Sequence, residues 1–497
     1  MCNSPSIEAS GRSRRRAASQ LATRSLILAA VAAAPLAGWP ADARALTAIE
    51  ELGKNVFFDT NLSRPRGKQA CASCHDPARG WVLPLAAINR HIVAAPGAVP
   101  GAFGSFKTPA NAYATFVPAF RSSVVPFLAP WLGGVFWDGR AEGCGKTDGS
   151  CPVGSGTASA TIRLADLPPA KQAAYGRFLG PTADQALNPF PNPVEQNIPI
   201  DEVCREVQFA RYRVLYPVAF GERIDCGAIP TIPGTDRPAL VSFKRLAVAI
   251  AAWQASREVN SFSSKRDVAI RSERDGQFPL RGFTDQENLG HDLFYGVESI
   301  LNPRRPDGTL PSGNCASCHN GVPEGQAADT TGVAPQQLYT DSRYHNIGVP
   351  FNREIPGVPK LAKLGLKSHE ASVGRGLFKT PTVRNVAKGL DRRFTKAFTH
   401  NGWFKSLESL VHFYNTRDAL GRCEALPNPI TDATEAEALA NNCWPKPEFG
   451  EIVPLPSPPD DVRPAPTFGR NGLTTEQELA IVAYLRTLSD RVTPRRP

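Results

Sequence analysis

The sequence predicts a mainly α-helical protein whose two halves repeat one another, with long loops rich in proline and glycine. Three observations lead to this expectation. The pentapeptide Cys-Ala-Ser-Cys-His occurs at residues 71–75 and returns unchanged at residues 315–319. Similar segments flank both copies. Runs that alternate apolar and polar residues, as half-buried strands do, are nearly absent.

The N-terminus predicts a secretory signal peptide at residues 1–45. Arginines at residues 12–24 precede the apolar run Leu26–Leu36, and Ala43-Arg44-Ala45 forms a small-residue cleavage site. An uncleaved membrane anchor is the alternative. It would need about 20 unbroken apolar residues, whereas Pro35 and Pro40 interrupt this run. The leader predicts a periplasmic protein.

The Cys-x-x-Cys-His motif is the attachment signature of a c-type haem, in which both thiols form thioethers and the histidine binds iron. Two haems are therefore expected, one on Cys71, Cys74 and His75, and one on Cys315, Cys318 and His319. A zinc site would need further ligands nearby, and a redox dithiol does not require the histidine. The expected fold is two cytochrome c-like haem domains, at residues 46–265 and 266–497.

Repeated segments define each half. Leu52–Phe58 precedes the first motif as Leu289–Tyr295 precedes the second, and Phe-Lys-Thr-Pro follows at residues 106–109 and 378–381. Amphipathic helices are expected to close the halves at residues 243–253 and 473–488, the second with a capping box of Thr475 and Glu478. The polar stretch 261–275 has no apolar periodicity and is predicted to be the linker.

Segments 142–183 and 422–466 have no counterpart in the other half and are expected to be surface insertions. Apart from Cys2 and the motif thiols, six cysteines remain and fall into three local pairs. In an oxidising compartment such pairs form disulfides: Cys144–Cys151, Cys204–Cys226 and Cys423–Cys443. Six cysteines allow 15 pairings, so the connectivity stays open. The net charge of +10 includes the leader, and no basic cluster with interleaved aromatics predicts nucleic-acid binding.

Four segments, at residues 52–75, 136–140, 185–196 and 400–415, resemble the bacterial di-haem cytochrome c peroxidase and MauG superfamily, in the family's order. The resemblance implies that hydrogen peroxide reacts at the N-terminal haem, beside positions matched by Gln185, Pro189 and Glu195. A carboxylate there can both take and return a proton, so Glu195 is the acid–base candidate and Gln185 would orient peroxide. Solvated polar residues in a proline-rich loop are the plainer alternative. Trp137 matches the tryptophan that relays electrons between the haems, although a core tryptophan is the commoner fate of that residue.

The second haem departs from the peroxidases proper, which use a methionine as sixth ligand. The only methionine is Met1, which leaves with the leader. The resemblance places Tyr414 at that position, where MauG also has a tyrosine. His400 and His412 are competing candidates for the sixth ligand. The simpler alternative for Tyr414 is a tyrosine packed in the core.

Two further roles are implied by the resemblance. His91 lies where peroxidases carry a histidine that closes the peroxide site, although it could also be a packed histidine. The family's calcium site matches Asn111, Thr395 and Ala397, but the family usually has proline at the last position. Oxygen ligands suit calcium.

The expectation is a periplasmic di-haem peroxidase-like oxidoreductase that reduces hydrogen peroxide with electrons from a small periplasmic donor protein. A MauG-like enzyme that oxidises a protein substrate is the first alternative, which Tyr414 and the missing methionine favour chemically. A two-haem electron carrier is the other, and it would need neither Gln185 nor Glu195. The sequence carries no signal for an oligomeric state.

Overall fold

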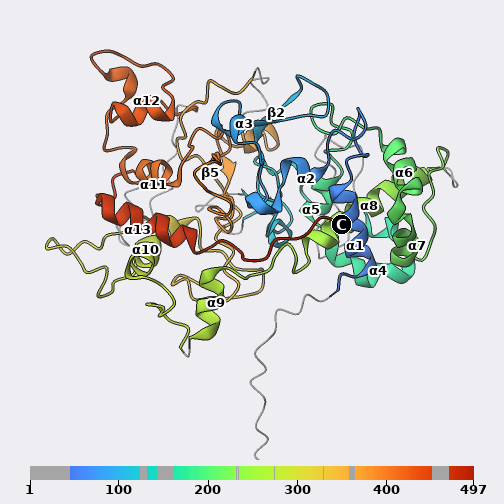
Figure 1. Cartoon of the computed structure of the whole chain (residues 1–497), viewed down its shortest axis with the longest axis horizontal. Coiled ribbons are helices and arrows are strands. Elements are labelled where there is room, and N and C mark those ends of the chain that lie inside the picture. Colours follow the sequence, from blue (N-terminus) through green and yellow to red (C-terminus); the bar gives the residue numbers. More distant parts are fainter. Residues whose placement is uncertain are drawn as a thin grey trace, which may run out of the picture. The chain divides into compact units, whose positions relative to one another are not determined.

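Helices provide most of the regular structure in the computed structural model, as the sequence predicts (Figure 1). The structure describes residues 45–123, 131–143, 162–230, 232, 234–273, 275–327, 329–356, 364–449 and 469–497. The predicted signal peptide up to Arg44 and the predicted Cys144–Cys151 pair lie outside the described residues. No helix in the described ranges is long and apolar enough to cross a membrane.

The helices are distributed over both halves of the chain. The first half contains α1 (Ala48–Phe58), α2 (Cys71–Cys74), α3 (Ala86–Arg90), α4 (Pro169–Tyr175), α5 (Pro181–Ala186), α6 (Ile200–Phe209), α7 (Leu215–Phe220) and α8 (Pro238–Gln254). The second contains α9 (Lys265–Ser272), α10 (Asp285–Tyr295), α11 (Leu407–Thr416), α12 (Glu435–Ala440) and α13 (Thr475–Arg486). Antiparallel two-stranded sheets join β1 (Ala94–Pro96) to β2 (Phe103–Lys107), β3 (Arg121–Ser122) to β4 (Trp131–Leu132), and β5 (Tyr344–His345) to β6 (Phe378–Lys379).

The first hydrophobic core forms where α1 packs on α8. Gly53 makes the close approach possible, because a Cβ atom there would collide with the main-chain carbonyl of Ala249. Phe57 on α1 and Trp253 on α8 are fully buried against each other, with ring centroids 4.9 Å apart. Apart from Leu338, the buried residues of this core come from the chain before residue 260.

The second core repeats this packing with α10 on α13. Gly290 on α10 lies against the carbonyl of Ala480 on α13, so a Cβ atom there would collide in the same way. Leu293 and Tyr484 are fully buried at this contact. The matched sequences Leu52-Gly53 and Leu289-Gly290 thus occupy matched packing positions, and the two cores meet within one compact unit from Ala45 to Pro497.

Two sequence predictions differ from the structure. The expected linker contains α9, whose N-cap Ser264 forms a capping box with Asp267. The helix buries the charged residues Arg266 and Asp267 beside Ala269 and Ile270, so its buried face is not marked by apolar periodicity. In α13 the N-cap is Thr474, paired with Gln477, one residue earlier than predicted.

The one-residue difference in α13 has a tertiary cause. The predicted capping carboxylate, Glu478, instead accepts hydrogen bonds from Asn415 on α11 (2.5 Å) and from the His412 ring (3.0 Å). Glu478 therefore joins α13 to α11 rather than closing the start of its own helix.

Charged and polar pairs hold distant segments of the chain together. Arg384 donates to both carboxylate oxygens of Asp267 at 2.9 Å, and both side chains are completely buried. Tyr113 donates to Asp490 at 2.7 Å, and Asn385 donates to the same oxygen at 2.9 Å. Residues from the beginning, middle and end of the chain are thereby held together.

Two of the three predicted disulfides are confirmed. Cys204 pairs with Cys226, and Cys423 pairs with Cys443. The first ties α6 to the loop before α8, and the second closes the loop that carries α12. The four motif cysteines form no disulfide.

Candidate haem and peroxide sites

The first motif lies on a single turn of helix. Cys71 and Cys74 begin and end α2, so their thiols lie on one face, and His75 follows as the C-cap. The Nδ1 atom of His75 is 3.2 Å from the carbonyl oxygen of Trp81. Burial lowers the pKa of His75 to about 4, so the ring is neutral at pH 7. With Nδ1–H donating to a carbonyl, Nε2 presents a lone pair suited to iron.

The second motif has the same chemistry on a different local structure. Cys315 begins the short 3₁₀ helix Cys315–Ser317, and Cys318 follows it. The Nδ1 atom of His319 is 2.9 Å from the carbonyl oxygen of Tyr339, and burial lowers the pKa of this imidazole too. Both histidines are therefore held as neutral ligands by a main-chain carbonyl.

Three of the four motif thiols are not activated for redox chemistry. Burial raises the pKa of Cys71, Cys74 and Cys315 to about 12, which keeps them as thiols at neutral pH. A redox dithiol works through a thiolate of lowered pKa. This environment disfavours the dithiol reading for both motifs.

A cavity of about 1040 Å³ adjoins the second motif. Cys315, Cys318 and His319 line it at one side and Tyr414 lines it as well. Most of its wall is apolar, from side chains of the second core: Phe294, Val349, Leu407, Leu410, Ile481 and Leu485. Its size is at the upper limit of small-molecule pockets, which run to about 1,000 Å³. A neutral imidazole, two thiols and a large apolar space fit a haem.

The three candidate sixth ligands differ in placement. Tyr414, on α11, lines the cavity, and burial together with Cys318 and Cys315 raises the pKa of its hydroxyl. His400 also lines the cavity, but its Nε2 is 2.9 Å from Glu448 and its ring stacks on Phe378. His412 is outside the lining and contacts Glu478. The geometry favours Tyr414 among the three.

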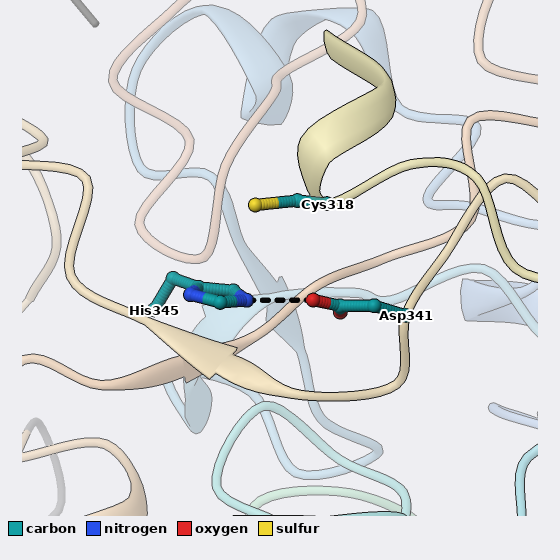
Figure 2. A group of neighbouring side chains, drawn as sticks. All are labelled: Cys318, Asp341 and His345. Atoms are coloured by element: carbon teal, nitrogen blue, oxygen red, sulfur yellow. Dashed lines mark hydrogen bonds and ion pairs between the residues drawn. The ribbon is translucent and has the colours of Figure 1, made fainter. Parts of the chain in front are cut away.

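A buried ion pair lies beside Cys318. Figure 2 shows Asp341 and His345 facing each other, with Oδ2 and Nε2 2.7 Å apart, and Cys318 on one side of the pair. Burial alone would lower the pKa of His345, but Asp341 and Cys318 raise it to about 10. The ligand atoms of the three lie within 4.8 Å of one another, as a metal site would require. A thioether at Cys318 removes the thiolate that such a site needs. Sequence reasoning missed Asp341 and His345 because they lie more than 20 residues beyond the motif.

The structure brings Glu195 to the first motif. Its carboxylate acts electrostatically on both Cys71 and Cys74, and burial raises its own pKa against the lowering effect of Arg140. The neighbouring Gln196 is buried, with Oε1 3.7 Å from the Cys71 sulfur. This places Glu195 on the cysteine side of the first haem site.

The other two predicted peroxide residues lie in the same segment. Pro189 is adjacent to Gln196, whose N–H donates to the Pro189 carbonyl at 3.0 Å. Gln185 is in the last turn of α5, and its carbonyl accepts from Asn188 N–H at 3.1 Å. Next to Gln185, burial raises the pKa of Asp184 to about 6. The chain from α5 to Glu195 therefore folds back toward the motif.

Trp137 contacts both halves of the chain. Its side chain is almost fully buried, and its Nε1–H donates to the carbonyl of Lys107 at 2.7 Å. Its own carbonyl accepts from the N–H of Lys379 at 3.0 Å. It lines the cavity of the second motif, with its ring 6.4 Å from that of His400.

The positions of His91 and of the predicted calcium ligands give little support to their predicted roles. His91 is exposed, with Nδ1 3.2 Å from Glu354. The Thr395 carbonyl accepts from the Asn89 side chain at 3.0 Å, and Asn111 and Ala397 are buried. The buried ammonium of Lys396, between Thr395 and Ala397 in sequence, donates to two carbonyls nearby.

Several residues at the first site carried no sequence signal. The side chain of Gln69 donates to the Cys74 sulfur at 3.1 Å and to the Pro96 carbonyl at 3.0 Å. Arg140 binds both oxygens of Asp138, at 2.9 and 2.8 Å, and from there acts on Glu195. The available signal was position in the sequence. Gln69 lies two residues before the motif, and Arg140 lies in the same segment as Trp137.

Comparison with known proteins identifies the family. Residues 47–275 match the family model of di-haem cytochrome c peroxidase. The chain is 30% identical to methylamine utilization protein MauG of Paracoccus denitrificans over 472 residues, which cover 92% of each protein. The chain belongs to the family of di-haem cytochrome c peroxidases and MauG.

Two further relatives are peroxidases. Cytochrome-c peroxidase IdrP2 of Pseudomonas sp. (strain SCT) is 25% identical over 447 residues, covering 85% of this chain and 87% of that protein. The crystal structure of the diheme peroxidase BthA of Burkholderia thailandensis superposes with a TM-score of 0.57 at 26% identity, covering 90% of this chain and 88% of that one. Membership of this family implies haem cofactors and supports an oxidoreductase.

Proposed function

We propose that the protein is a periplasmic di-haem peroxidase that reduces hydrogen peroxide at its N-terminal haem. Each Cys-x-x-Cys-His motif attaches one haem covalently, and the matched packing of α1 on α8 and α10 on α13 reflects an internal repeat of two haem domains, residues 46–265 and 266–497. The paired cysteines outside the motifs support export to an oxidising compartment.

The observation that carries the proposal is the placement of Glu195. An electron carrier needs no partly buried carboxyl beside a haem motif, and removing such a group from water is costly. A carboxyl whose pKa is raised by burial is suited to exchanging protons near neutral pH. Arg140 opposes that shift and keeps the group able to ionise.

Bound haem supplies the redox-active iron at which a peroxide O–O bond is cleaved. Glu195 takes the proton from one peroxide oxygen and returns it to the departing oxygen, and Gln185 orients the peroxide. Asp138 holds Arg140 in place, and the positive charge of Arg140 lowers the pKa of Glu195. Trp137, bonded to both halves, relays electrons between the two sites, and a small donor protein returns them.

A second candidate function is oxidation of a protein substrate, as in a MauG-like enzyme. The placement of Tyr414 in the cavity of the second motif favours it, because a phenolate ligand gives a haem that is a poor store of electrons from a cytochrome. The two candidates share the peroxide chemistry and differ in the electron source. Calcium at Asn111, Thr395 and Ala397 belongs to either proposal.

Replacing Glu195 tests the proposal. Glu195→Gln keeps the shape of the side chain and removes the base, so the reaction with hydrogen peroxide should slow roughly 10²–10⁴-fold, with both haems still attached. Stopped-flow absorption of the reduced protein mixed with peroxide measures the rate. The matched control is Glu222→Gln, at an exposed carboxylate paired with Arg245, which should leave the rate unchanged. Equal rates for Glu195→Gln and wild type would reject Glu195 as the proton shuttle.

A further inference from the structure

Two lysines occupy the same position in the two halves. Lys107 ends β2 and Lys379 ends β6, each within the sequence Phe-Lys-Thr-Pro. Both line the cavity of the second motif. Burial lowers the pKa of each ammonium to about 8.

Neither ammonium has a hydrogen-bond or ion-pair partner among the described residues. The three lysines that are buried in the described ranges do have partners. Lys244 contacts Asp166 at 3.1 Å as well as Asp236, Lys54 contacts Glu258 at 3.0 Å, and Lys396 donates to two carbonyls. An unpaired ammonium inside a protein is costly unless a counter-charge arrives. Two such groups at repeated positions indicate that the counter-charge belongs to a ligand.

The chain just after each lysine contacts the histidine of that lysine's own motif. Two residues after Lys107, the main chain of Pro109 contributes to the pKa of His75 by a hydrogen bond, and Pro381 does the same for His319. Lys107 also acts electrostatically on His75. The acid that acts electrostatically on Lys379 is Asp341. Its Oδ2 atom is already paired with His345.

Both lysines are also bonded to Trp137 through their main chains. Trp137 donates from Nε1 to the Lys107 carbonyl and accepts at its own carbonyl from the Lys379 N–H. The Lys107 ammonium is 5.9 Å from the centre of the Trp137 ring. Phe106 and Phe378, which precede the lysines, pack edge to face at 5.8 Å. Trp137 is therefore hydrogen-bonded to the main chain of both lysines, one from each half.

We propose that Lys107 binds a propionate carboxylate of the first haem and Lys379 a propionate carboxylate of the second. This assignment rests on the proposal that each motif carries a haem. A haem has two ionised propionates, which supply the counter-charge that neither lysine finds in the protein. A charge-assisted bond of this kind is also the stronger class of hydrogen bond.

The pairing has an electrostatic consequence. An ammonium beside a propionate cancels charge that would otherwise stabilise the ferric over the ferrous state. Removing the ammonium therefore lowers the midpoint potential of the adjacent haem. Because each lysine serves one haem, each substitution should act mainly on its own haem.

Spectroelectrochemical titration of the purified holoprotein tests the assignment with Lys107→Gln and Lys379→Gln. We expect the first to lower the potential of one haem, the second to lower that of the other, and Lys→Arg at either position to restore most of the shift. Controls are Lys68→Gln and Lys446→Gln, which remove the same charge from exposed positions. Potentials no lower than those of the controls would overturn the proposal.

Two further readouts separate the possible failures. A pyridine haemochrome ratio below two haems per wild-type chain would reject the two-haem proposal itself, independently of the lysines. Where a glutamine variant does not accumulate, the Lys→Arg variant is compared with wild type in the propionate bending region of the resonance Raman spectrum. A shifted band supports the contact, and an unchanged band at both positions contradicts it.

Discussion

Arg384 and Asp267 form a completely buried ion pair in the second half of the chain, and replacing Arg384 by methionine measures how strongly this pair stabilises the fold. The substitution keeps much of the side-chain volume but leaves the Asp267 carboxylate buried, with Arg266 3.5 Å away as the remaining cation. Breaking a buried pair by removing one partner costs roughly 3–5 kcal/mol. We expect the free energy of unfolding at pH 7 to fall by about 3 kcal/mol. The loss stays at the lower end of that range because Arg266 still offsets part of the buried charge of Asp267.

The pH dependence gives a second magnitude. Burial alone would raise the pKa of Asp267, but Arg384 and Arg266 lower it from 3.8 to about 2. One pKa unit corresponds to about 1.4 kcal/mol, so the shift contributes roughly 2–3 kcal/mol. Because the folded pKa is the lower one, this stabilisation is complete above about pH 5 and is lost as the pH falls from about 4 to 2. Arg384→Met should remove most of this acid-dependent loss.

Urea unfolding followed by the Soret band and by circular dichroism, at pH 7 and at steps down to pH 3, checks both magnitudes. The control is Arg304→Met, at an exposed ion pair with Glu298, where the expected change is below about 1 kcal/mol. An Arg384→Met protein as stable as the control variant at pH 7 would refute the claim that this pair stabilises the fold. If the free energy of unfolding of Arg384→Met fell with decreasing pH as it does in wild type, the pH dependence could not be assigned to Asp267.

Three other predictions concern the second haem, the relay and a disulfide. Tyr414→Phe should change the absorption and EPR spectra of the second haem while leaving the peroxide reaction rate at the first nearly intact; an unchanged spectrum would assign the sixth position to another ligand. Trp137→Phe should slow electron transfer between the haems in stopped-flow traces without changing the haem content, and unaltered transfer would contradict the relay. Replacing Cys423 and Cys443 together by serine should cost roughly 2–4 kcal/mol, measured by thermal unfolding, and no loss would mean that the loop is held by its other contacts.

The repeated segments allowed the two cores to be anticipated from the sequence. Leu52-Gly53 and Leu289-Gly290 mark helices that pack on a partner so closely that only glycine fits. The sequence did not indicate α9, because apolar periodicity was the signal sought and half of the residues that this helix buries, Arg266 and Asp267, are charged. Burial of a charged pair depends on a partner, Arg384, that lies more than 100 residues away.

The residues of the candidate site could be predicted where they belong to a local sequence motif. His75 and His319 follow directly from Cys-x-x-Cys-His, and their carbonyl partners could not be read from it. His345 is brought to Cys318 by the pairing of β5 with β6, and no local pattern records that pairing. Lys107 was visible in the repeated Phe-Lys-Thr-Pro, but only the missing partner in the folded chain gives it a role.

The central claim is that the two haems are unequal, with one open to peroxide beside Glu195 and the other closed by a protein ligand. An EPR spectrum of the fully oxidised protein tests it most directly, because spin state reports axial ligation at both irons at once. The account predicts a high-spin ferric signal from the N-terminal haem, where neither Glu195 nor Gln185 is a strong-field ligand, together with a distinct signal from the Tyr414-ligated haem. Two low-spin signals with strong-field protein ligands on both irons would contradict the account and identify an electron carrier.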